Sequence, residues 1–252
     1  MKKMINVISD EAVDIIKNSS NYNKHPFGHI IIDNFLKEEY LNDAVQYTQR
    51  LRPQECTNYR MPPNPNTQYK LAYDDINRFP LRLKQIFREL NSERFCEMLE
   101  KFVGIDGFIF GNHELEGAGI HKITNGGFLG LHTDFNNYND SEYGSLDRRV
   151  NILIYLNPDW KEEYGGHLWI GDSDSMTIHE KVLPVLNRCI IFNTTNKSIH
   201  GHPERMTVPS YIHRNSIALY YYTRNKNVNT CFENDKFHST IYYDIKEFAE
   251  KI

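Results

Sequence analysis

Apolar residues recur with two different spacings along the chain. In roughly the first hundred residues they return every three or four positions, which is typical of amphipathic helices. We predict helices over residues 9–18 and 37–51, a short strand at 30–32, and one or two helices over 81–103. This part of the chain therefore predicts a mixed, partly helical region.

From about residue 107 the apolar residues fall into short segments separated by turn residues such as Asn125-Gly126-Gly127 and Asn157-Pro158-Asp159. Many short strands without intervening helices indicate an antiparallel sandwich or barrel, and a jelly roll is the interpretation we favour. The predicted strands span residues 108–110, 128–132, 150–156, 167–170, 182–186, 189–192 and 217–222.

These patterns predict a mainly β fold with flanking helices (α+β). We expect an N-terminal helical support at residues 1–105, a double-stranded β-helix (jelly roll) core at 106–224, and a C-terminal extension at 225–252. The extension is polar, and residues 243–251 carry the spacing of a short final helix.

Composition narrows the classes of function. The 252 residues carry a formal net charge of −4, so no basic excess is present to neutralise nucleic-acid phosphates. No signal peptide or membrane-length apolar stretch is apparent, which predicts a cytoplasmic protein without a membrane partner. Cys56, Cys96, Cys189 and Cys231 are scattered and form no CxxC pair, so we expect reduced thiols. The oligomeric state does not follow from the sequence.

The first residues that carry chemistry are His132 and Asp134. Residues two apart on a strand share a face, so this imidazole and this carboxylate can converge on one ion. Two histidines and one carboxylate, with the remaining positions open, suit Fe(II) that also binds a co-substrate and O2. A third ligand is then needed downstream. His200 and His202 would face the same way on a strand, so their spacing does not choose between them.

A second set of residues follows that histidine pair. On a strand, Arg214 and Ser216 share a face. A guanidinium at that position can hold a carboxylate with two hydrogen bonds, and the small serine beside it leaves room for a ligand in the barrel. We therefore predict a carboxylate-binding site at Arg214 and Ser216.

Taken together, these motifs resemble the prolyl-4-hydroxylase-like branch of the Fe(II)/2-oxoglutarate dioxygenases. The resemblance covers residues 117–223 and includes the iron motif, the Arg148 to Trp160 strand and turn, and the Arg214-Asn215-Ser216 motif. Its segments are residues 126–128, 132–135, 148–160, 165–168, 187–192, 200–203 and 214–216.

The resemblance implies His132, Asp134 and His200 as iron ligands, with His200 preferred over His202 by a His-Gly-x-Pro pattern. It implies that Arg214 binds the distal carboxylate of 2-oxoglutarate and that the Tyr155 hydroxyl shares it. Many relatives carry a tyrosine on the strand that enters the metal motif. This chain reads His121-Lys122-Ile123-Thr124 there, which puts that cofactor contact in doubt.

The implied activity is hydroxylation that consumes O2 and 2-oxoglutarate and releases succinate and CO2, with ascorbate as a reductant. A peptidyl proline is the family's default substrate, and a free amino acid, another small molecule or a glycan precursor is compatible. The alternative is a cupin-like metal-binding jelly roll, an isomerase or a sensor, that does not use 2-oxoglutarate.

Residues 135–147 leave directly from the metal motif and are rich in Asn, Asp, Ser and Gly. That composition predicts an exposed, mobile loop near the mouth of the iron pocket. We expect Tyr138 and Tyr143 of this loop to help hold the substrate.

Overall fold

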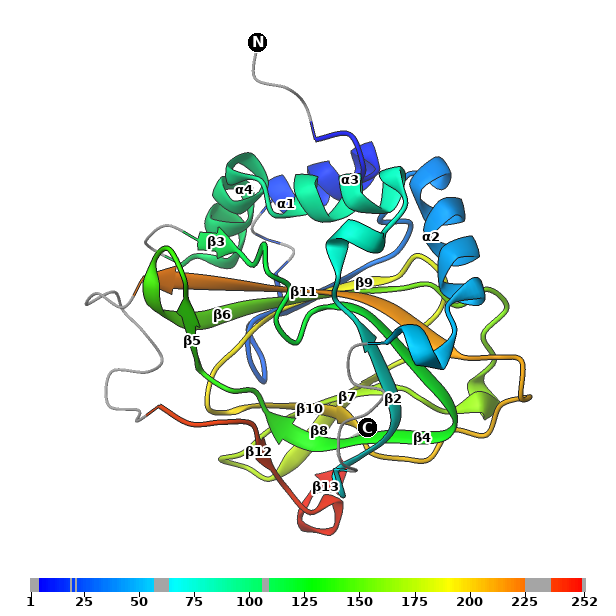
Figure 1. The fold of residues 1–252 in the computed structure, drawn as a ribbon. Helices are drawn as coiled ribbons and strands as arrows, with labels where there is room; N and C mark the ends of the chain where they lie inside the picture. The colour runs from blue at the N-terminus through cyan, green and yellow to red at the C-terminus, as the bar shows by residue number, and fades with distance from the viewer. Residues whose placement is uncertain are drawn as a thin grey trace.

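The computed structural model describes residues 5–18, 20, 22–56, 64–105, 109–224 and 237–250. Three layers are visible in Figure 1: a group of helices, a β layer beneath it, and a second β layer on the far side. The helices are α1 (Asp10–Lys17), α2 (Glu38–Arg50), α3 (Leu81–Leu90) and α4 (Glu93–Val103). No helix in the described part of the chain is long and apolar enough to cross a membrane.

The described strands join into one curled sheet of 13 strands. Their order is β1-β9-β6-β11-β4-β10-β7-β8-β13, with β2 and β12 paired to β4, β3 to β11 and β5 to β6. The strands before the predicted core are β1 (His29–Ile32) and β2 (Thr67–Tyr73), and those after it are β12 (Ile241–Tyr242) and β13 (Ala249–Glu250). The core strands are β3 (Ile109–Gly111), β4 (Gly119–Thr133), β5 (Asn137–Asp140), β6 (Gly144–Tyr155), β7 (Leu168–Asp172), β8 (Thr177–Val182), β9 (Cys189–Asn193), β10 (Ser198–His202) and β11 (Arg214–Arg224).

Local signals in the sequence account for the helix ends. The Ser9 hydroxyl accepts a hydrogen bond from the Ala12 backbone N–H, which caps α1. Ser92 caps α4 in the same way, and Gly104 ends that helix at φ 66°, a left-handed conformation that glycine adopts at little cost. The three predicted helical regions are confirmed: the first two are α1 and α2, and the stretch at 81–103 forms the two helices α3 and α4.

The largest apolar cluster lies between the helices and the β6–β11 layer. It includes Leu83 and Phe87 of α3, Phe95 of α4 and Tyr221 of β11, all fully buried. The Tyr221 hydroxyl donates to the Leu90 carbonyl at 2.9 Å, which ties β11 to the end of α3. The helices thus cover the outer face of this layer and leave its inner face to the second layer of the roll.

Strand β4 belongs to both β layers. Its first half pairs with β11, Ser216 opposite His121, and its second half pairs with β10, His200 opposite His132. Because β4 passes from one layer to the other, residues on its two halves face the same interior.

Three predictions about local structure are wrong. Residues 135–147 are not an irregular loop: β5 pairs with β6 in a hairpin, whose turn is held by the Asp140 carboxylate accepting from the backbone N–H groups of Glu142 and Tyr143. Residues 243–251 contain no α-helix among those described, because a single 3₁₀ turn (Ile245–Glu247) leads into β13, which pairs with β8. The strand predicted at 182–186 lies too far along the chain. The observed strand is β8, which ends at Val182, the first residue of the predicted range.

The division into regions ending at residues 105 and 224 stays a prediction. Cys56, Cys96 and Cys189 are buried and form no disulfide with one another, and Cys231 lies outside the described residues.

Candidate metal centre and its cavity

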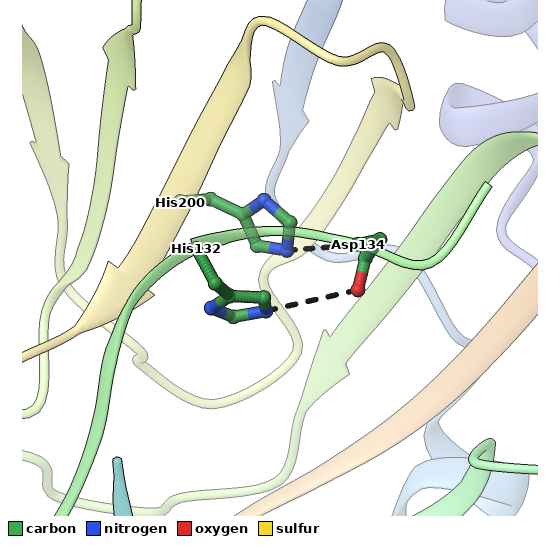
Figure 2. Close-up of side chains that lie close together, drawn as sticks. All are labelled: His132, Asp134 and His200. Atoms are coloured by element: carbon green, nitrogen blue, oxygen red, sulfur yellow. Dashed lines mark ion pairs between the residues drawn. The ribbon is translucent and has the colours of Figure 1, made fainter. Parts of the chain in front are cut away.

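Two histidines and one carboxylate converge between the β layers (Figure 2). His132 Nε2 lies 3.7 Å from Asp134 Oδ1, and His200 Nε2 lies 3.3 Å from Asp134 Oδ2. One ligand atom from each residue falls within 4.8 Å of the other two, and no other such group of His, Cys, Asp or Glu occurs in the described part of the chain. The three residues are at most 7% exposed, so the cluster is shielded from solvent.

Backbone carbonyls fix the orientation of both imidazole rings. His132 Nδ1 is 2.8 Å from the Gly130 carbonyl, and His200 Nδ1 is 3.0 Å from the Ser198 carbonyl. A carbonyl can only accept, so each Nδ1 carries the proton and each Nε2 presents a lone pair toward Asp134. Burial and the neighbouring His200 lower the pKa of His132, which keeps its ring neutral, as a metal ligand must be.

Two residues of β6 hold the Asp134 carboxylate. Asn151 Nδ2 donates to Asp134 Oδ2 at 2.7 Å, and Arg148 Nη2 lies 3.1 Å from the same oxygen. Burial alone would raise the pKa of Asp134, but Arg148 and the two imidazoles outweigh it and hold that pKa well below its usual range. Asp134 is therefore ionised and has a fixed orientation.

The Arg148 guanidinium is itself fully enclosed. It stacks 3.5 Å from the Tyr220 ring centroid, and its Nε donates to Asn151 Oδ1 at 3.0 Å. Sequence reasoning did not assign Arg148 or Asn151 to the site. Asn151 did carry a signal, since it is the one amide in the otherwise apolar start of the strand predicted at 150–156, and a buried amide needs a hydrogen-bond partner.

Arg214 and Ser216 line the cavity that contains the cluster, and Tyr155 lies behind Arg214. The Arg214 Nε donates to the Gly166 carbonyl at 2.7 Å, and its Nη2 lies 3.4 Å from the Tyr155 hydroxyl oxygen. Gly166 has φ 72°, and a Cβ there would come within 2.8 Å of the Met206 sulfur and 3.1 Å of Arg214 Cδ. Only glycine lets the guanidinium lie so close to this backbone.

The cavity has a volume of about 190 Å³ and runs from the cluster of His132, Asp134 and His200 to Arg214. Several residues that line the cavity were not predicted from the sequence. They are Lys70 of β2, and Thr240 and Tyr242 of the C-terminal segment. The Tyr242 ring centroid lies 5.5 Å from that of His132. His121 also lines the cavity, at the position where many relatives carry a tyrosine, and its Nε2 lies 3.0 Å from the Gly117 carbonyl.

His202 lies in the same cavity but outside the three-residue cluster. It is 2% exposed, and neither ring nitrogen has a hydrogen-bond partner among the described residues. The geometry thus separates His200 from His202, which spacing along the strand could not do.

Neither tyrosine expected to hold the substrate lines the cavity. Tyr138 is 6% exposed, packs on Tyr222 and donates a hydrogen bond to Glu114. The Tyr143 ring stacks 4.9 Å from that of Phe110, outside the cavity. The substrate role predicted for these two residues has no support in this geometry.

One protein-family model matches part of this chain. The family model described as "2OG-Fe(II) oxygenase superfamily" matches residues 118–222. No curated protein matches the sequence significantly.

Among solved structures, a prolyl hydroxylase from Trichoplax adhaerens, in complex with a peptide fragment of hypoxia inducible factor, has a TM-score of 0.58 at 20% identity and covers 84% of this chain and 91% of its own. A Pseudomonas putida prolyl-4-hydroxylase has a TM-score of 0.56 at 16% identity, covering 84% and 99%. HygX from Streptomyces hygroscopicus, with nickel and 2-oxoglutarate bound, has a TM-score of 0.53 at 13% identity, covering 95% and 98%. At these identities the likeness concerns the fold, and it confirms the predicted double-stranded β-helix.

Proposed function

We propose that residues 118–222, which match the model of the 2OG-Fe(II) oxygenase superfamily, form the core of a 2-oxoglutarate-dependent hydroxylase whose iron is held by His132, Asp134 and His200. The observation that carries the proposal is the convergence of two Nε2 lone pairs and one ionised carboxylate in a buried cluster. Two histidines and one carboxylate are the donor set of non-haem Fe(II) oxygenases, and they leave coordination positions open for other ligands. The family match favours this reading over the cupin-like alternative.

Arg214 would bind the distal carboxylate of 2-oxoglutarate. Its Nε is held by the Gly166 carbonyl, so the guanidinium has a fixed orientation and its remaining N–H groups are available to a ligand. The Ser216 side chain faces the same space, and the Tyr155 hydroxyl lies beside the guanidinium. The hydrogen bonds of Arg214 within the described part of the chain are with the Gly166 carbonyl and the Tyr155 hydroxyl, neither of which is anionic, which leaves the role of counter-ion to a ligand.

When bound, Fe(II) and 2-oxoglutarate activate O2, so that one oxygen atom enters the substrate and the other enters succinate as CO2 leaves. The protein's own part is to orient and to exclude water. Asn151 and Arg148 fix Asp134, the two backbone carbonyls fix the imidazoles, and the Tyr242 ring covers the side of His132. We include ascorbate as the reductant that maintains Fe(II).

A peptidyl proline is the first substrate to test, because the sequence resembles the prolyl-4-hydroxylase-like branch. The Trichoplax neighbour is described in complex with a peptide, which supports testing a peptide as the substrate of a protein with this fold. A free amino acid or another small molecule remains a candidate for the same site.

Anaerobic addition of Fe(II) and 2-oxoglutarate tests the proposal, since the complex has a weak visible metal-to-ligand absorption band. We expect the band and succinate formation from the wild-type chain, and neither from His132→Ala, Asp134→Ala or His200→Ala. His202→Ala is the matched control and should keep the band, because a side chain outside the ligand set changes metal affinity only about 10–100-fold. A band that survives His200→Ala but not His202→Ala would overturn the ligand assignment.

A further inference from the structure

A second cavity lies on the opposite side of β11 from the candidate metal centre. Successive residues of a strand face opposite sides of the sheet. Arg214 and Ser216 line the cavity of the metal centre, whereas His213 and Asn215 line the second one, which has a volume of about 260 Å³. The rest of the wall of this outer cavity comes from the end of α2 and from the segments after β6 and before β11. None of its lining residues takes part in the proposed iron chemistry.

Two polar atoms of the outer cavity have no hydrogen-bond partner among the described residues. They are Asn215 Oδ1 and His213 Nδ1. Asn215 is 6% exposed, and its Nδ2 donates to the His213 carbonyl at 3.3 Å. Because a carbonyl can only accept, this contact identifies the amide nitrogen and leaves the amide oxygen as the unpaired atom. A buried acceptor without a partner costs free energy, so we expect a group with N–H or O–H donors beside Asn215.

The charges around the outer cavity favour a cation. Its lining includes the carboxylate of Asp159 and, in the part of the chain that the structure describes, no lysine or arginine. Burial, and after it the charge of Lys122, lower the pKa of His213, so this ring is neutral at pH 7 and does not repel a cation. The Lys122 ammonium donates to the carbonyls of Thr48 and Leu51, both at 3.1 Å, where the negative end of the α2 dipole compensates it.

The shape of the outer cavity favours a small, flat group. Tyr211 lines it and is 80% exposed, so its ring lies at the entrance and can stack on a planar cation. Trp160 is nearly buried and its Nε1 donates to the Gly165 carbonyl at 3.1 Å, so its indole offers carbon surface only. Sites for drug-sized ligands have volumes of roughly 300–1,000 Å³, so this smaller cavity fits a single side chain or a molecule of similar size.

We propose that the outer cavity binds a guanidinium, of free arginine or of an arginine side chain in a peptide. A guanidinium is planar, carries several N–H donors and stacks on aromatic rings. Asn215 Oδ1 and the Asp159 carboxylate accept its N–H groups, and the Tyr211 ring covers its plane. Because Arg214 faces the other side of β11, the site requires neither iron nor 2-oxoglutarate, and its test is independent of the proposed function.

The fluorescence of Trp160 provides the readout. The chain has two tryptophans, and Trp169 lies in a different apolar cluster, so in a Trp169→Phe chain the signal comes from the wall of the outer cavity. The probes are free L-arginine, N-acetyl-L-arginine amide and the neutral N-acetyl-L-citrulline amide, added to the full chain without Fe(II). We expect a saturable change with both arginine probes, and about tenfold or more higher concentrations for citrulline, which lacks the charge. The arginine probe that binds more tightly identifies the source of the guanidinium.

Variants of the outer cavity locate the binding, each in the Trp169→Phe chain. Tyr211→Ala removes an exposed ring and should weaken binding of the arginine amide about 2- to 30-fold, the range for a cation on an aromatic ring. Asp159→Asn should weaken it roughly 1.5- to 5-fold, and asparagine also adopts the φ of 52° found there. Asn215→Leu removes the buried acceptor and should weaken it about tenfold or more, with thermal unfolding as the check on its fold.

Two controls complete the test. Tyr143→Ala removes a tyrosine of the β5–β6 hairpin that does not line the outer cavity, and it should bind the arginine amide as the parent chain does. Arg214→Met should also bind it unchanged, since Arg214 lines the other cavity. Equal responses to arginine and citrulline, no response to either arginine probe, or equal binding by Tyr211→Ala and Tyr143→Ala would overturn the proposal. Loss of the response in Arg214→Met would also overturn it, because the probes would then occupy the cavity of the metal centre.

Discussion

Replacement of Arg214 should weaken binding of 2-oxoglutarate in graded steps. Arg214 is 4% exposed, and the groups that its guanidinium contacts among the described residues are the Gly166 carbonyl and the Tyr155 hydroxyl. A desolvated charge pair that loses one partner costs about 2–5 kcal/mol. Arg214→Met should therefore raise the dissociation constant of 2-oxoglutarate roughly 30- to 5,000-fold.

Two milder variants separate the contributions of charge and geometry. Arg214→Lys keeps the charge but loses the Nε that donates to the Gly166 carbonyl at 2.7 Å and orients the group. Loss of one charge-assisted hydrogen bond costs about 1.5–3 kcal/mol, which predicts roughly 10- to 150-fold weaker binding. Tyr155→Phe removes a neutral hydroxyl, for which about 0.5–1.5 kcal/mol predicts roughly a 2- to 10-fold loss.

The assay is anaerobic titration of the Fe(II)-loaded chains with 2-oxoglutarate, followed by the visible band. Thermal unfolding of each metal-free variant checks that it folds. Affinity should fall in the order Tyr155→Phe, Arg214→Lys, Arg214→Met. If Arg214→Met bound 2-oxoglutarate as well as Tyr155→Phe does, Arg214 would not be the carboxylate partner and the reasoning from its burial and orientation would be refuted.

Two further predictions concern the residue that supports the Asp134 carboxylate and a partly buried ion pair between His29 and Glu180. Asn151→Ala removes the 2.7 Å hydrogen bond to Asp134, so the affinity for Fe(II) in a metal titration should fall about 10–100-fold. Asn137→Ala on β5 is the control and should leave that affinity unchanged. Equal affinities of the two variants would contradict the role of Asn151. Burial lowers the pKa of His29, but its hydrogen bond to Glu180 outweighs burial and the pKa is raised above its ordinary value of 6.5. The pair therefore stabilises the fold below pH 6.5 and loses this contribution as pH rises through the raised pKa, so Glu180→Gln should lower the free energy of unfolding, by less than about 1 kcal/mol, at the lower pH only. A loss that is independent of pH would contradict this assignment.

The sequence was sufficient for the parts of the site whose geometry is local. His132 and Asp134 are two residues apart on one strand, and Arg214 and Ser216 share a strand face, so the two-residue period of a strand already places each pair. The punctuated apolar segments likewise predicted the roll. Strand spacing alone could not choose between His200 and His202. The resemblance favoured His200, and the pairing of β10 with β4 places His200 opposite His132.

The missed residues depend on contacts between segments far apart along the chain. Lys70 enters the cavity because a bulge at Tyr69 redirects β2, and a polar stretch before it gave no sign of this. Tyr242 enters because β12 pairs with the end of β4. Tyr138 shows the opposite error: the polar composition around it suggested a loop, but pairing with β6 and packing on Tyr222 override local propensity.

The pairing of β12 with β4 also orders events in time. The ribosome makes Tyr242 only after it has made His132, Asp134 and His200, and domains begin to fold from the N-terminal side during synthesis. A nascent chain can therefore present all three proposed metal ligands while the wall beside His132 is still missing. Closure of the metal centre against solvent is then a later step than assembly of the ligands, and iron that arrives early meets an open site.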